Sequence, residues 1–146
     1  MIKTNEITEF LPPVRIVGSS ETINAEFLVG NAARQVPLGG DKYASVMPKG
    51  WVLLDYGVEI SGGVRILTQI VRSSVFSAKI RIRFGESATE AMSELGEKNS
   101  GNHHSTRDFI CNVQNLSEVR LGSTGFRFVR IDNIDESRID FLSVQA

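Results

Sequence analysis

The sequence has little cysteine and no long apolar run, and both absences narrow its classification. Cys111 is the single cysteine among the 146 residues, so an internal disulfide is excluded. This fits the cytoplasm and does not exclude export. No apolar run approaches the roughly 20 residues of a membrane-spanning helix, and residues 1–6 contain no apolar signal-peptide core. We therefore expect a cytoplasmic protein by default, or a periplasmic or exported one if the chain is part of a longer precursor.

An excess of either charge is also missing. The 16 Lys and Arg residues face 17 Asp and Glu residues, which gives a net charge of −1. A surface that follows nucleic-acid phosphates, or a polybasic stretch that binds anionic membranes, requires clustered basic residues. We therefore expect neither a nucleic-acid partner nor a membrane partner.

The common catalytic and cofactor-binding motifs are absent as well. The sequence contains no GxSxG, Walker A, HExxH or CxxC pattern. Glu86 and Glu90 invite comparison with the paired carboxylates of glycosidases, but a helix-capping role already explains Glu90. The length excludes a complete (β/α)₈ barrel, which needs at least roughly 200 residues. We expect a chain that is not an enzyme and binds no cofactor; a structural calcium ion is left open, although no motif supports it.

The sequence does contain a series of short strand patterns separated by turn residues. Pro12 and Pro13 disfavour helix in residues 1–13, which we interpret as a lead-in to a single domain over residues 14–146. About nine to eleven short strands and one short helix predict an all-β sandwich. The strands are expected at residues 14–17, 26–29, 43–47, 51–55, 58–60, 64–71, 79–84, 108–113, 118–121, 126–132 and 138–144, with turns at 61–63 and 122–125.

Two of these strand patterns also predict which side chains face the core. In residues 79–84, strict alternation directs Ile80, Ile82 and Phe84 inward and the basic residues between them, including Arg83, outward. In residues 126–132, the even-numbered side chains share one face and the odd-numbered side chains share the other. Both of these faces are partly apolar, so we place this strand in the middle of a sheet.

One helix is expected, over residues 88–95. Apolar side chains recur from Ala88 with the i, i+3, i+4, i+7 spacing of a helix face. Ser87 and Glu90 have the spacing of a capping box, and Gly96 suits a helix C-terminus. Because a two-turn helix is marginal alone, it must pack on the sheet.

The most concentrated polar segment covers residues 101–108. Its adjacent histidines, His103 and His104, could ligate a metal, act as acid or base, or hydrogen-bond to a sugar. Two neighbouring histidines are an incomplete zinc site, because such sites use three or four protein ligands. A solvated structural loop is the alternative interpretation.

Arg107 lies at the end of this segment, where a strand begins. Adjacent strand residues point to opposite faces, so Arg107 is not expected to pair with Asp108. A structural ion pair with Glu86, Glu90 or Asp132 across the strands is the more natural arrangement.

Three further side chains could have functional roles but fit a core better. Cys111 lies among apolar strand residues, so we expect a buried, inert thiol. Trp51 and Tyr56 border a strongly apolar strand. Exposed aromatic rings can stack on sugars, but here we favour core packing.

Three segments together resemble a known family. The first, residues 53–66, contains LLDYGVE and then GGVRI. The second is RIRFGES (residues 81–87), and the third is GFRFVRI (residues 125–131). Their order and spacing resemble the galactose-binding-like, or discoidin-type, jelly roll. More narrowly, they resemble the N-terminal β-sandwich of bacterial α-L-rhamnosidase-like glycoside hydrolases. In those chains an RFGES…EA segment, a polar loop with His and then Arg-Asp, and GFRFVRID recur in this order. The resemblance covers residues 10–146.

This resemblance implies a jelly-roll sandwich with an accessory, carbohydrate-binding function. The parent family cleaves terminal rhamnose with an (α/α)₆ catalytic barrel, and we expect this chain to end before any such barrel. The expected partners are a rhamnose-containing glycan and an (α/α)₆ catalytic domain in cis or in trans. The alternative is a structural, interdomain or oligomerisation sandwich with no ligand. By resemblance, and with no catalytic or metal-binding residue expected, the candidate ligand-binding residues are Glu86, Glu90, Asn102, His103, His104, Arg107 and Asp108.

Overall fold

Strands make up nearly all the regular structure of the computed structural model, which describes residues 7–94 and 107–146. In chain order they are β1 (Arg15–Ile23), β2 (Ala44–Val71), β3 (Ser77–Gly85), β4 (Asp108–Gln114), β5 (Ser117–Asn133) and β6 (Ile139–Gln145). A 3₁₀ helix, η1 (Ala25–Leu28), and an α-helix, α1 (Ala88–Met92), complete the described elements. The all-β fold class expected from the sequence is therefore confirmed.

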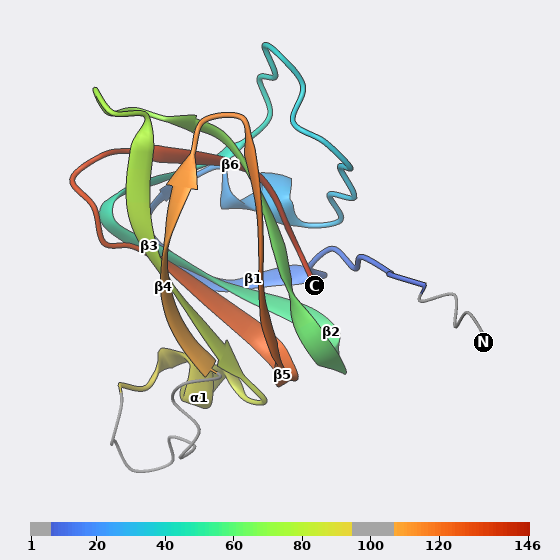
Figure 1. Ribbon diagram of the computed structural model, residues 1–146. Coiled ribbons are helices and arrows are strands. Elements are labelled where there is room, and N and C mark those ends of the chain that lie inside the picture. Colours follow the sequence, from blue (N-terminus) through green and yellow to red (C-terminus); the bar gives the residue numbers. More distant parts are fainter. Residues whose placement is uncertain (1–6, 95–106) are drawn as a thin grey trace, which may run out of the picture.

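The strands pair antiparallel in the order β1-β2-β5-β3-β4, and β6 pairs with β2 off this path. The long strands β2 and β5 each bend and contribute to both layers. Residues 51–55 of β2 pair with residues 128–132 of β5, whereas residues 64–68 pair with residues 117–121. Figure 1 shows the resulting jelly-roll β-sandwich, with α1 at one end.

The turns expected at residues 61–63 and 122–125 are bends within continuous strands. The pairing of β2 with β5 shifts register between Asp55 and Ile60 and again between Gly62 and Val64. Such bulges let a strand bend without ending it. At the second shift, a Cβ atom on Gly63 would collide with the carbonyl oxygens of Leu121 and Gly122. The glycines that predicted a turn instead allow two strands to cross closely.

The main core lies between the two layers and is built around aromatic rings. Phe126 contacts Tyr56 edge-on at a centroid distance of 6.0 Å and Phe84 at 4.9 Å. Ile80, Ile82 and Phe84 are buried as expected. Each such side chain contributes about 1.5–3 kcal/mol on burial, so the rings and β-branched residues of the paired strands supply most of the stabilisation.

Arg83 points away from the main core, as expected, but it is not exposed to solvent. Only 4% of Arg83 is exposed, because the segment after α1 covers it. Its Nη1 donates to the Ser93 carbonyl at 3.3 Å and to Glu94 at 3.2 Å, and its Nη2 donates to Asp132 at 3.0 Å. A strictly alternating pattern cannot reveal that a later segment folds back over a polar face.

The two faces of β5 also differ from the expected division. Phe126 packs in the main core together with Val129 and Ile131, whereas Phe128 packs on the opposite face with Leu53. The bulge between the β2 partners of Phe126 and Phe128 reverses the alternation at this point. The central position of β5 is confirmed, since it pairs with β2 on one side and β3 on the other.

The strand expected at residues 26–29 is wrong, because this segment forms η1. Ala25 and Leu28 are both buried in the main core. Their separation of three residues places them on one face of a 3₁₀ helix, whereas a strand would direct them to opposite faces. Core packing at the end of β1 therefore outweighs the β-propensity of the segment.

Helix α1 is confirmed but is shorter than expected. Ser93 and Glu94 are not helical, and the rest of the expected range lies outside the described residues. Ser87 caps the helix by accepting a hydrogen bond from the Glu90 N–H at 3.1 Å. Ala91 is buried against β3, whose Gly85 leaves no room for a Cβ atom beside the Ala91 backbone. The helix thus packs on the outer face of the sheet.

The described part of the lead-in is held at the C-terminal end of β6. Leu11 and Ala146 exchange two backbone hydrogen bonds of 2.8 Å, and the Val14 N–H donates to the Asp55 carbonyl. Leu11 and Val14 are therefore tied to the sandwich, whereas residues 7–9 are exposed. The division into a lead-in over residues 1–13 and one domain over residues 14–146 stays a prediction.

Candidate functional site

The first candidate site is an ion-pair cluster beside α1 that contains three of the expected residues. Arg107 Nη1 lies 2.9 Å from Glu90 Oε1, and Arg107 Nη2 lies 3.3 Å from Glu86 Oε1. The other Glu90 oxygen accepts from the Glu86 N–H at 2.9 Å. The expected Arg107 ion pair is confirmed. Its most accessible member is Glu86, whose side chain is 56% exposed.

The capping box differs in one detail from its usual form. In the usual form the Glu side chain accepts from the backbone N–H of the cap residue itself. Here the Glu90 carboxylate accepts from Glu86, one residue earlier than the Ser87 cap. Glu90 thus joins the helix start to the end of β3 and to Arg107, so its three interactions are mainly structural.

Asp108 belongs to a second, neighbouring ion-pair ladder on the same edge. Arg81 donates to both Asp108 oxygens, at 2.9 and 2.6 Å, and to Glu94. The Arg81 hydrogen bond holds the pKa of Glu94 below its ordinary value, and Asp108 raises the pKa of Arg81. The ladder continues through Arg83 to Asp132, which also pairs with Arg130. Charge is balanced along this edge, so it favours no ligand of one sign.

The remaining expected residues are Asn102, His103 and His104. They lie outside the described residues, so their proposed ligand contacts stay a prediction. Of the seven candidate residues, the structure brings Glu86, Glu90 and Arg107 into one cluster and places Asp108 in the adjacent ladder.

The burial predicted for Tyr56, Trp51 and Cys111 is complete for the tyrosine and partial for the other two side chains. Tyr56 is buried, as expected, and its hydroxyl donates to the Val144 carbonyl at 3.1 Å. Trp51 is only partly buried: it packs against the small cluster under α1, and Arg130 lies 4.6 Å from its ring centroid. Cys111 is also only partly buried, and desolvation raises the pKa of its thiol, which fits an unreactive cysteine.

Asp55 is a polar centre that the sequence analysis missed. Its carboxylate accepts from Arg127 at 2.9 and 3.1 Å, from Arg15 at 2.9 Å, and from the Gly57 N–H at 2.7 Å, while only 1% of the residue is exposed. The Arg127 hydrogen bond, helped by those of Gly57 and Arg15, holds the pKa of Asp55 far below its ordinary value against the opposing effect of burial. The signal was an acidic residue in an otherwise apolar strand.

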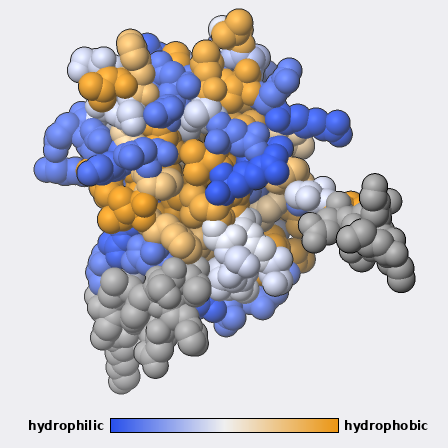
Figure 2. All heavy atoms as spheres, viewed as in Figure 1, coloured by the Kyte–Doolittle hydropathy of each residue, from blue (hydrophilic) through white to orange (hydrophobic). Residues whose placement is uncertain are grey.

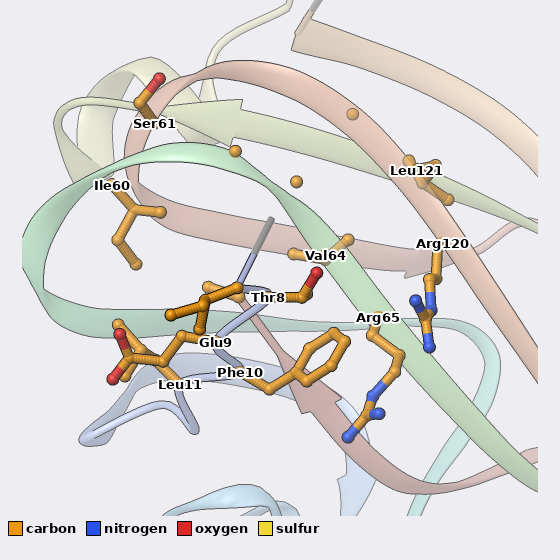
Figure 3. A pocket seen from close by; sticks show the side chains of 15 residues that line it. Thr8, Glu9, Phe10, Leu11, Ile60, Ser61, Val64, Arg65, Arg120 and Leu121 are labelled. Carbon is orange, nitrogen blue, oxygen red and sulfur yellow. The ribbon is translucent and has the colours of Figure 1, made fainter. Parts of the chain in front are cut away.

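A second candidate site, also missed, is a cavity of about 500 Å³ between the lead-in, the bend of β2 and β5. Phe10 is one of its lining residues and lies beside Arg65 (Figure 3), with the Arg65 guanidinium carbon 3.7 Å and that of Arg120 5.1 Å from the ring centroid. Nothing in the local sequence marks it, since these residues come from three distant segments. A hollow lined by two arginines and an aromatic ring can hold a small polar ligand.

Two absences hold for the part of the chain that the structure describes. Within residues 7–94 and 107–146, no three His, Cys, Asp or Glu side chains gather in a way that could hold a metal ion. Among the same residues, no helix has the length and hydropathy to cross a membrane.

Comparisons with known proteins identify similar folds. No protein-family profile and no curated protein matches the sequence. Among solved structures, a rhamnosidase from Klebsiella oxytoca with rhamnose bound superposes with a TM-score of 0.65 at 17% identity, over 94% of this chain and 28% of that chain. This chain therefore spans less than a third of that enzyme.

Two other matches are domains of about the same length as this chain. The CBM32 of AlyQ, in complex with 4,5-unsaturated mannuronic acid, has a TM-score of 0.59 at 10% identity and covers 94% of this chain and 97% of that chain. The C-terminal domain of a chitobiase from Bacteroides fragilis has a TM-score of 0.58 at 10% identity, over 94% and 95%. The described chain thus has the jelly-roll β-sandwich fold found in a CBM32 domain and in part of a rhamnosidase.

Proposed function

We propose that this chain is a non-catalytic carbohydrate-binding module. The observation that carries the proposal is the correspondence of the whole chain to a whole CBM32 domain, over 94% of one and 97% of the other. The described residues also leave little chain for a catalytic apparatus, because strands and their connections account for most of them. The candidate carboxylates beside α1, Glu86 and Glu90, are both paired with Arg107, and Glu90 also supports the start of the helix, which suits structural roles.

The site we propose for the sugar is the edge beside α1. Glu86 can accept hydrogen bonds from sugar hydroxyls with its exposed carboxylate, and Arg107 fixes that carboxylate in place. Asn102, His103 and His104 precede Arg107 in the sequence and would add amide and imidazole groups. Glu90 and Asp108 would act as supports for Glu86, Arg107 and Arg81 rather than as direct contacts.

Calorimetric titration of the purified chain against a broad panel of oligosaccharides tests the proposal. We expect heat and saturable binding with at least one glycan, and at least a threefold loss of affinity in Glu86→Gln and His104→Gln variants. Glu136→Gln, an exposed carboxylate near β6, is the matched control and should bind as the unsubstituted chain does. Absence of binding across the panel would contradict the proposal.

A narrower proposal is that the module accompanies an α-L-rhamnosidase-like catalytic domain of the (α/α)₆ type, in cis or in trans. It is supported by the superposition on the rhamnosidase and by the order of the three sequence segments. Rhamnose-containing oligosaccharides should then be the tightest ligands in the panel. The isolated chain should release no rhamnose from them, and release would refute its non-catalytic assignment.

A further inference from the structure

Arg65 carries a buried charge that no carboxylate of the described residues neutralises. Only 6% of the residue is exposed, and it takes part in none of the ion pairs of residues 7–94 and 107–146. Burial of an unpaired charge is strongly unfavourable unless other groups compensate for the lost hydration. A protein that retains such an arginine next to an open cavity has a charge suited to pairing with a ligand.

The guanidinium of Arg65 is held in one orientation by neutral groups. Its Nη2 donates to the Ala33 carbonyl at 2.9 Å and to Gln145 Oε1 at 2.5 Å. Gln145 is fixed in turn, because its Nε2 donates to the carbonyls of Ala33 at 2.7 Å and Asn31 at 3.1 Å. A guanidinium positioned in this way loses little conformational entropy when it binds an anion.

The other two nitrogens of the Arg65 guanidinium, Nε and Nη1, form no hydrogen bonds with the described residues. The Nε is buried without a hydrogen-bond partner, and the Phe10 ring lies against the guanidinium. The Nη1 donates to no acceptor in the described part of the chain. Because Nε is buried, Nη1 is the nitrogen left to donate to a ligand in the cavity.

The surroundings of Arg65 are basic on both sides of Phe10. The cavity of about 500 Å³ includes Arg120, and an adjoining cavity of about 440 Å³ includes Arg34. Arg34 is exposed and forms no ion pair within the described residues, and Arg120 is paired with Glu118. The acidic residue among the described linings is Glu9, and its carboxylate points to the side of Phe10 away from Arg65 and Arg120 (Figure 3).

We propose that these two cavities form a binding site for the carboxylate of an acidic, uronate-type sugar. The inference rests on the proposed carbohydrate-binding function and names a ligand class and a second location for it. Arg65 would bind the carboxylate through Nη1, with Arg34 and Arg120 on either side, because hydrogen bonds from a guanidinium to a carboxylate are charge-assisted and strong. Thr8 and Ser61 line the cavity with hydroxyls that can bond to the sugar ring.

Titration with trigalacturonate and with its fully methyl-esterified form tests this site, because esterification removes the negative charges and adds only a methyl group to each carboxyl group. We expect the acid to bind at least tenfold more tightly than the ester at 50 mM NaCl, and this preference to shrink at 300 mM NaCl. Arg34→Gln and Arg120→Gln alter exposed side chains, so both variants should fold, and each should weaken binding of the acid about fivefold. Lys79→Gln removes one exposed positive charge on β3 and should have no effect.

The outcomes separate this inference from the proposed function. Equal affinity for acid and ester, or full affinity in both arginine variants, overturns the acidic-sugar site while the module stands. Binding of neutral glycans in the wider panel, with no heat from trigalacturonate, would also overturn the acidic-sugar site and leave the carbohydrate-binding module in place. If no glycan binds at all, the proposed function fails and this inference fails with it.

Discussion

Replacing Asp55 with Asn should destabilise the protein more than any other single polar substitution on β2. The substitution keeps the shape of the side chain, and its remaining oxygen can still accept from the Gly57 N–H. It removes the negative charge and sets an amide against the guanidinium groups of Arg15 and Arg127. The three hydrogen bonds from these arginines are charge-assisted, and each such bond is worth about 1.5–3 kcal/mol in a buried setting.

The solvent exposure of Arg15 and Arg127 reduces the free energy that their hydrogen bonds to Asp55 contribute. The Arg15 and Arg127 side chains are 60% and 39% exposed, so water solvates both guanidinium groups once the carboxylate is gone. We therefore expect a loss of about 2–3 kcal/mol in the free energy of unfolding for Asp55→Asn. At this chain length the loss corresponds to a decrease of about 5–10 °C in Tm.

The pH dependence provides an independent check of the same carboxylate. Because the folded-state pKa of Asp55 lies below its value in the unfolded chain, its stabilisation is complete above about pH 4 and is lost as the pH falls toward the folded-state pKa. The stability difference between the unsubstituted chain and Asp55→Asn should thus be constant from pH 5 to 7 and shrink below pH 4. Urea denaturation followed by tryptophan fluorescence measures it.

The control for this series is Asp41→Asn, which removes an exposed carboxylate from the loop before β2. It should change the free energy of unfolding by less than about 0.5 kcal/mol. An Asp55→Asn variant as stable as this control, or a stability difference that widens in acid, would refute the reasoning.

Three other substitutions or reactions test the packing. Gly63→Ala should strongly lower Tm, because the new Cβ would collide with two backbone carbonyls of β5. Gly62→Ala is the control and should be tolerated, because its Cβ would meet Ile60 at 3.8 Å. Equal Tm values for the two variants would contradict the close crossing of the strands. Phe126→Ala should cost about 3–5 kcal/mol in urea denaturation, while Phe76→Ala, at a side chain left 59% exposed, should cost under about 1 kcal/mol. Iodoacetamide should alkylate Cys111 at pH 8 at least several-fold more slowly in the folded chain than in 8 M urea. The reason is that burial raises the pKa of the thiol in the folded chain. Equal rates would show an accessible thiolate.

Local sequence patterns predicted the elements whose environment is set by nearby residues. The alternation of residues 79–84 identified β3 and three of its core side chains, and the spacing of Ser87 and Glu90 identified the start of α1. These features depend on interactions that span a few residues. The ion pair of Arg107 was also predictable, since the carboxylates of Glu86 and Glu90 lie at the start of the helix that the capping-box spacing identifies.

Long-range features were not predictable in the same way. Arg83 is buried because the segment after α1 covers it, and no local pattern contains that information. The bulge before Phe128 reverses the side-chain alternation of β5 through its pairing with β2. The Phe10 cavity joins the lead-in to two bends that lie about fifty and a hundred residues further along the chain, so spacing alone could not reveal it.

The two bent strands have a consequence for the way in which this chain reaches its folded state. β6, the last strand in chain order, pairs with both ends of β2, so that Ile139 lies opposite Val46 and also opposite Val71. Neither layer can be completed until this strand has been synthesised and has docked. Pairings across such long sequence separations make folding slow, on the order of milliseconds to seconds. During that interval β2 presents unpaired edges, which are the parts of the chain most exposed to aggregation on the ribosome.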